Sequence, residues 1–180
     1  MKKIFFLSLF AFLLVSCGSS STESDNNVKK HTGSGFVIDI PSSWTVVDNS
    51  QIPNIKSWKI ELAVSSSDIS SGFANNLVII WEQLNEKITS KKYSTINYAL
   101  TNWNYLEFSK LDEKTISFSD KDESNLYIFE AKYNTSTPKR KFLQTSKVCD
   151  NKVHLITIWI SLDITDASKY ENLIKSFECK

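Results

Sequence analysis

Alternation of apolar and polar side chains constrains the fold of this chain more than any other feature. Residues 36–40 (FVIDI) and 58–65 (WKIELAVS) place an apolar side chain at every second position, the period of a strand with one buried face. Residues 77–81 (LVIIW) are apolar throughout, which is typical of a strand covered on both faces. We predict further strands over residues 44–47, 105–110, 115–119, 125–133, 140–149 and 152–160.

Two segments follow the helical period instead. The first stripe, with Ser90 as its expected N-cap, consists of Tyr93, Ile96, Leu100 and Trp103. The second, with Thr165 or Asp166 as its expected N-cap, consists of Tyr170, Leu173, Ile174 and Phe177. We predict helices over Tyr93–Trp103 and Ala167–Phe177, each packing its narrow apolar stripe on a sheet with the other face in water. The order of these elements indicates an α+β fold with a largely antiparallel sheet.

The N-terminus has the pattern of a secretory signal peptide. Lys2 and Lys3 precede residues 4–15, twelve residues of which only Ser8 is polar. Twelve residues are too few to span a bilayer as a helix, which needs about 20, but they suit the apolar region of a signal peptide. The next residues complete the segment 14–17 (LVSC), which resembles the lipobox of bacterial lipoproteins. We therefore predict removal of residues 1–16 and attachment of lipid, such as palmitate-bearing diacylglycerol, to Cys17.

Lipid on Cys17 would hold the protein to a membrane of the cell envelope, on the extracytoplasmic side, because two or three acyl chains on one residue anchor a protein stably. Residues 17–34 (CGSSSTESDNNVKKHTGS) are mostly small or polar, and we expect a flexible linker there. Removing Lys2 and Lys3 from 21 basic residues leaves 19 against 20 acidic ones. That balance gives no electrostatic basis for binding nucleic acid. Residues 35–180 are expected to form one domain.

Two short motifs resemble PsbP-like proteins. Residues 36–44 (FVIDIPSSW) resemble the family's opening F-x-I-x-x-P-x-x-W segment, and residues 174–177 (IKSF) resemble the end of its last helix. The resemblance spans residues 35–178 and implies an α/β/α sandwich on an antiparallel sheet, in which Pro41 turns the chain while Trp44 and Phe177 fill the core. The family includes the PsbP subunit of photosystem II, Ran-binding Mog-type proteins and many bacterial lipoproteins. These share a fold and a tendency to bind proteins rather than a reaction, so no functional residue carries over.

The motifs of the common catalytic classes are absent from the sequence. None of its four glycines lies beyond Gly72, which excludes the glycine-rich loops of P-loop and dinucleotide-binding proteins. Of its two histidines, His31 falls in the expected linker and His154 is expected to be partly exposed at the start of a strand. There is no C-x-x-C or H-E-x-x-H motif. We predict no catalytic residue, no metal site and no cofactor.

Three other features have structural interpretations. Residues 120–125 (DKDESN) faintly resemble a calcium loop, but the sixth and twelfth positions are Asn125 and Ala131, so we expect a solvated hairpin turn. Residues 139–141 (KRK) are expected to form a solvated turn rather than a partner-binding patch. Four of the five tryptophans fall in the predicted core stripes, whereas Trp58 follows a proline-containing loop and is expected at the surface.

These observations favour a tethered, non-catalytic module that binds or assembles other proteins of the cell envelope. The alternative is a small-molecule carrier with a cleft between the sheet and a helix. A hydrolase with an unrecognised site would require a strongly perturbed carboxylate or histidine in a cleft.

Cys149 and Cys179 are predicted to form a disulfide. With Cys17 lipidated, they are the other two of the three cysteines in an exported protein. From the turn at Cys149, a strand to Ile160 runs away by about 30 Å. The last helix returns by about 18 Å, and the extended tail adds about 7 Å, so the C-terminus ends near that turn. The alternative is two unpaired thiols.

Overall fold

A computed structural model describes residues 27–47, 59–70 and 72–180. The predicted signal peptide (1–16), the lipidation site Cys17, the first part of the expected linker (17–26) and Trp58 lie outside the described residues.

Ten strands and two helices make up the described part of the chain. In order they are β1 (Val28–Gly33), β2 (Phe36–Pro41), β3 (Thr45–Val46), β4 (Lys59–Ser70), β5 (Phe73–Gln83), α1 (Ser90–Asn104), β6 (Leu106–Ser117), β7 (Glu123–Lys132), β8 (Arg140–Cys149), β9 (Lys152–Ile160), α2 (Ser168–Lys175) and β10 (Glu178–Cys179). The two segments predicted as separate strands over 105–110 and 115–119 form the single strand β6.

The strands form two antiparallel sheets. The main sheet has seven strands in the order β3-β4-β5-β9-β8-β7-β6, and the small sheet has three in the order β1-β2-β10. Every pairing between these strands is antiparallel. The predicted antiparallel sheet with two helices is therefore confirmed.

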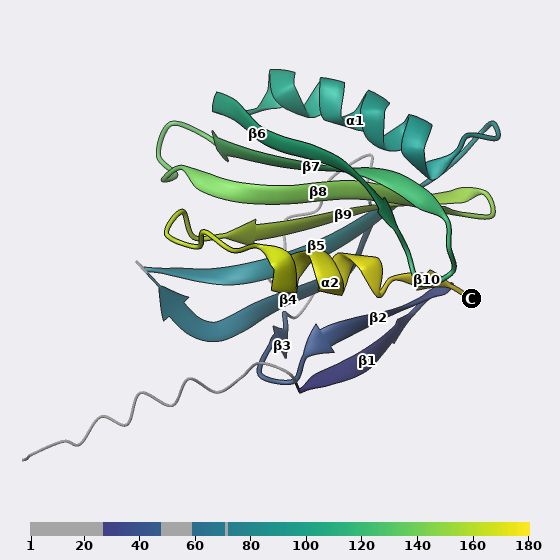
Figure 1. Cartoon of the computed structure of the whole chain (residues 1–180), viewed down its shortest axis with the longest axis horizontal. Coiled ribbons are helices and arrows are strands. Elements are labelled where there is room, and N and C mark those ends of the chain that lie inside the picture. Colours follow the sequence, from purple (N-terminus) through teal and green to yellow (C-terminus); the bar gives the residue numbers. More distant parts are fainter. Residues whose placement is uncertain (1–26, 48–58, 71) are drawn as a thin grey trace, which may run out of the picture.

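The main sheet is covered on both faces (Figure 1). Helix α1 packs against β7 and β8 on one face, where Tyr127, Phe129 and Phe142 form an aromatic cluster. Helix α2 and the small sheet cover the other face, above the larger core. That core contains Trp44 and Phe177, as predicted. Pro41 ends β2, and its carbonyl accepts a hydrogen bond from the Trp44 amide at 2.9 Å, which closes the expected turn.

The flexible linker was expected to extend to residue 34, and this is wrong for its last part. Residues 28–33 form β1, which pairs along its length with β2, from Val28 opposite Pro41 to Gly33 opposite Phe36. The physical reason is that backbone hydrogen bonds to β2 order the segment although its side chains are mostly polar and exposed. The ordered domain therefore includes residues before 35.

The predicted disulfide between Cys149 and Cys179 is present, with the two Cα atoms 5.5 Å apart. It joins the end of β8 to β10, which pairs with β2. A covalent bond therefore connects the main sheet to the small sheet.

Candidate functional site

The outer face of α1 carries three large apolar side chains in water. Ile96 is 45% exposed, Leu100 59% and Trp103 86%, and we call these three residues the α1 ridge. These side chains were expected to pack on the sheet, so the predicted orientation of α1 is wrong. Trp103 is accordingly not a core residue, whereas Trp44 is buried and Trp81 and Trp159 are partly buried.

The face of α1 that does pack on the sheet is polar, which explains the reversed orientation. Its buried residues are Ser90, Ser94, Asn97 and Thr101, spaced at i, i+4, i+7 and i+11. Thr101 donates a hydrogen bond to Gln144 of β8 at 3.0 Å, and Gln144 in turn donates to Thr157 of β9 at 3.2 Å. Because the sheet presents polar side chains here, small hydrogen-bonding residues satisfy them better than apolar ones.

Two tyrosines of α1 attach the helix to the sheet, one on each side of the helix. The ring of Tyr98 stacks on Tyr127 of β7, with centroids 3.9 Å apart. On the other side, the Tyr93 hydroxyl donates a hydrogen bond to the Glu82 carboxylate of β5. Burial and that carboxylate both raise the pKa of Tyr93 above its ordinary value. The contacts hold α1 in one rotation about its axis, with the ridge outward.

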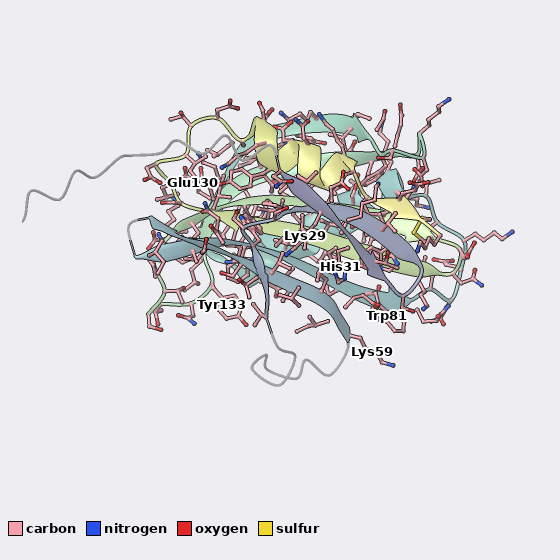
Figure 2. The ribbon with its side chains drawn as sticks, turned by 90° about the horizontal axis from the view of Figure 1, so that it is seen from below. Lys29, His31, Lys59, Trp81, Glu130 and Tyr133 are labelled. Atoms are coloured by element: carbon pink, nitrogen blue, oxygen red, sulfur yellow. A yellow bond between two sulfur atoms is a disulfide. The ribbon has the colours of Figure 1, made fainter. Side chains whose placement is uncertain are left out.

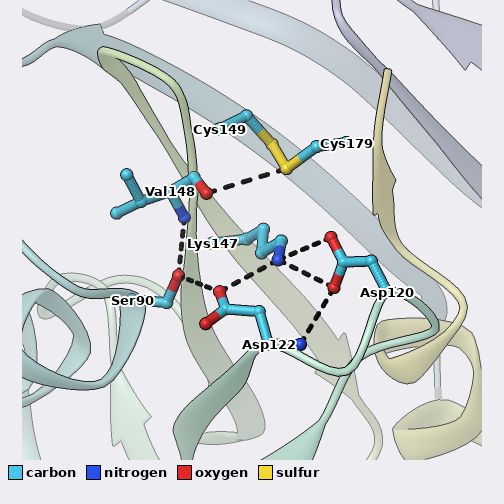
Figure 3. The surroundings of a disulfide bond; sticks show 7 residues. All are labelled: Ser90, Asp120, Asp122, Lys147, Val148, Cys149 and Cys179. Atoms are coloured by element: carbon cyan, nitrogen blue, oxygen red, sulfur yellow. Dashed lines mark hydrogen bonds and ion pairs between the residues drawn. A yellow bond between two sulfur atoms is a disulfide. The ribbon is translucent and has the colours of Figure 1, made fainter.

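The start of α1 is attached to a cluster of charged residues centred on the buried Lys147 (Figure 3). Thr89 caps the helix by accepting from the Lys92 amide at 3.2 Å. The Ser90 hydroxyl donates to Asp122 at 2.5 Å and accepts from the Val148 amide of β8 at 2.8 Å. The first turn of α1 is therefore joined to both β8 and the turn between β6 and β7.

Lys147 lies at the centre of this cluster and is only 2% exposed. Its ammonium group contacts Asp120 at 2.7 Å and Asp122 at 2.9 Å. Burial alone would raise the pKa of Asp120, but hydrogen bonds from Lys147 and from the backbone, with the nearby positive charge, hold that pKa below its ordinary value. Residues 120–122 lie in the expected turn between β6 and β7, whereas residues 123–125 already belong to β7. The two aspartates of this turn pair with a buried lysine rather than face only solvent.

Within α1 and the residues just before it, positive charge is confined to one end. Lys87, Lys91 and Lys92 are exposed at the start of α1. The helix contains no acidic residue, and its last turn contains no basic one. The ridge therefore has lysines beside its end at the start of α1 and no charged residue of α1 beside its other end.

His154 does not match the prediction of a partly exposed residue, because it is 1% exposed. It points to the same face of β9 as Ile156 and Ile158, into the core below α2 and β2. Its ring packs against Phe36 and Phe177, with centroids 5.2 and 5.3 Å away, and neither ring nitrogen has a hydrogen-bond partner. Burial, with a smaller effect of the Lys152 charge, lowers the pKa of His154 to about 4.

The residues 139–141 were predicted to form a solvated turn, and this is wrong. They lead into β8, where each basic side chain has its own contact. Lys139 pairs with Glu130 at 3.7 Å, and the Lys141 ammonium donates to the Ile164 carbonyl at 2.5 Å. The Arg140 guanidinium lies over the Phe73 ring at 4.3 Å.

Neither a metal centre nor a membrane-spanning helix is found among the described residues. In residues 27–47, 59–70 and 72–180, no three His, Cys, Asp or Glu side chains gather in a way that could hold a metal ion. The same part of the chain has no helix both long and apolar enough to cross a bilayer.

Comparisons with known proteins support the fold but identify no family. No family model and no curated protein matches the sequence. The solution structure of cyanobacterial PsbP (CyanoP) from Synechocystis sp. PCC 6803 is similar to this chain with a TM-score of 0.58 and 15% identity, over 93% of this chain and 99% of that chain. A crystal structure of a protein from Bacteroides thetaiotaomicron VPI-5482 has a TM-score of 0.46 and 10% identity, over 81% and 45% of the two chains. The likeness to CyanoP shows that the domain has the PsbP-like fold.

Proposed function

We propose that this protein is a lipid-anchored, non-catalytic module of the cell envelope that binds another protein through the α1 ridge. The observation that carries the proposal is the orientation of α1, which directs three large apolar side chains into water while hydrogen bonds hold its polar face on the sheet. Exposing large apolar side chains in a contiguous group is typical of an interaction surface. The lipobox-like segment ending at Cys17 supports the anchor.

The ridge suits a partner that offers an apolar groove. Its three residues lie at i, i+4 and i+7 and span about 10 Å along the helix, the spacing by which helices dock into grooves. Tryptophan and leucine at such a site would supply most of the binding energy, as buried aromatic anchors do at interfaces. The lysines at the start of α1 predict acidic groups at the corresponding end of the groove.

The charge pattern favours a protein partner over a membrane surface. A helix that lies in a membrane interface typically has basic side chains along its polar flanks. Here the lysines stand at one end, and the polar flank of the second half of α1 consists of uncharged residues such as Asn102 and Asn104. Basic side chains of α1 and of the residues just before it therefore stand at one end of the ridge only.

A photocrosslinking residue at Leu100, introduced into the chain in its native cells, tests the proposal. We expect a recurrent adduct with one envelope protein, which the substitution Trp103→Ser weakens. A crosslinker at Asn172, an exposed residue of α2, is the matched control and should give no such adduct. Adducts with lipid only would instead make the ridge a membrane contact, and the absence of any recurrent adduct at Leu100 would refute protein binding through α1.

A further inference from the structure

A pocket of about 300 Å³ lies at the end of the main sheet opposite to the disulfide. Its wall includes Phe73 at the start of β5, Tyr133 after β7, Pro138 and Arg140 around the start of β8, Phe142 within β8 and Trp159 near the end of β9. In Figure 2, Tyr133 and Glu130 lie toward this end of the sheet, away from Trp81 and Lys59 at the other end. The pocket is separate from the α1 ridge, because none of the three ridge residues lines it.

The wall is mainly aromatic. Phe142 and Trp159 pack with centroids 5.2 Å apart, and Tyr133 lies 6.3 Å from Trp159. Tyr133 is largely exposed, although a ring of that size would normally pack against neighbours. Together these rings form an apolar surface that one flat ring of a ligand would cover.

Arg140 provides the one guanidinium of this wall, and its charge lacks an opposing partner. Its Nε is buried and has no hydrogen-bond partner. In the part of the chain that the structure describes, no carboxylate pairs with it, although the adjacent Lys139 pairs with Glu130. The contact with the Phe73 ring balances the charge in part, as cation–π contacts do. A buried N–H donor on a cation normally has an acceptor, so an anionic ligand would complete this site.

We propose that this pocket binds a small aryl carboxylate, with its ring on the aromatic wall and its carboxylate on Arg140. The volume is at the lower end of the range for small-molecule sites, which fits one aromatic ring with a short chain. The planar guanidinium matches a carboxylate with two parallel hydrogen bonds. An inorganic anion would satisfy Arg140 but leave the aromatic wall uncovered.

Titration calorimetry of the purified protein with 3-phenylpropionate tests this proposal, with 3-phenylpropanol as the neutral counterpart. We expect the carboxylate to bind roughly ten- to a hundredfold more tightly than the alcohol, as for a hydrogen bond to a charged group. Arg140→Met should remove that difference, while Lys139→Met, the matched control outside the wall, should retain it.

The comparison of the two compounds on the unaltered protein does not depend on whether Arg140→Met folds. Equal binding of acid and alcohol, or no binding of either at millimolar concentration, would overturn the proposal. Inorganic phosphate binding as tightly as 3-phenylpropionate would also overturn it, because the aromatic wall would then contribute nothing. Because the ridge does not line this pocket, Trp103→Ser should leave the calorimetric result unchanged, which separates this test from the test of protein binding.

Discussion

Acidification should lower the free energy of unfolding through His154, at pH values where the carboxylates of the protein have little effect on stability. The buried ring has a pKa lowered to about 4, against an ordinary value of 6.5. Between those values the unfolded chain binds a proton that the folded chain does not, so stability is fully present above pH 6.5 and falls as the pH drops toward 4. One pH unit of this interval corresponds to about 1.36 kcal/mol, so the loss between pH 7.5 and 5.0 should be about 2 kcal/mol.

Urea unfolding at pH 7.5 and 5.0, followed by tryptophan fluorescence, measures this loss. His154→Phe replaces the imidazole with a ring that does not titrate and suits the neighbouring Phe36 and Phe177, and its stability should change little between the two pH values. His31→Gln is the control: burial also lowers the pKa of His31, but this histidine is only partly buried, so the variant should keep most of the loss seen in the unaltered chain. The pKa of Asp120 is lowered from 3.8, so its stabilising effect is lost only at lower pH. If His154→Phe loses as much stability as the unaltered chain, the reasoning is refuted.

Three further predictions concern the disulfide, the tryptophans and the anchor. Replacing Cys149 and Cys179 by alanine should lower the free energy of unfolding by about 3–4 kcal/mol in the chain-entropy model, measured by urea unfolding; a loss below about 1 kcal/mol would contradict it. Trp103→Ala should change stability by less than about 0.5 kcal/mol because the side chain is exposed, whereas Trp44→Ala in the core should cost about 3–5 kcal/mol; similar melting temperatures for the two variants would disprove this. Cys17→Ser should abolish incorporation of labelled palmitate in cells, and a labelled, processed variant would show that the anchor assignment is wrong.

The strands could be predicted from the sequence because a two-residue period specifies both the element and its buried face. The same alternation contained a signal for His154, which shares its parity with Ile156 and Ile158, and for Lys147, which shares its parity with Leu143. The prediction that His154 is partly exposed at the start of a strand overlooked that signal, and Lys147 was not singled out at all. The small strand β1 was missed because its order comes from pairing with β2, which no local pattern of residues 28–33 reveals.

The orientation of α1 could not be obtained from its apolar stripe. A helical period shows that one face differs from the other, but not which of them meets the sheet. The deciding residue is Gln144, far away in the sequence, whose side-chain oxygen accepts hydrogen bonds from Asn97 and Thr101. The pocket at Arg140 was likewise not predictable, because its wall comes from three strands, β5, β8 and β9, and from the connections that precede β5 and β8.

The disulfide also determines how a mechanical load would pass through the molecule. Under the anchoring proposed here, any pull on the tether enters the domain at β1, the edge strand of the small sheet. Hydrogen bonds carry it from β1 to β2 and from β2 to the two-residue strand β10. From β10 the covalent bond between Cys179 and Cys149 delivers it to β8, near the middle of the main sheet. As long as the pairings of β1 with β2 and of β2 with β10 hold, a force applied at the membrane therefore reaches the seven-stranded sheet, the larger of the two sheets among the described residues.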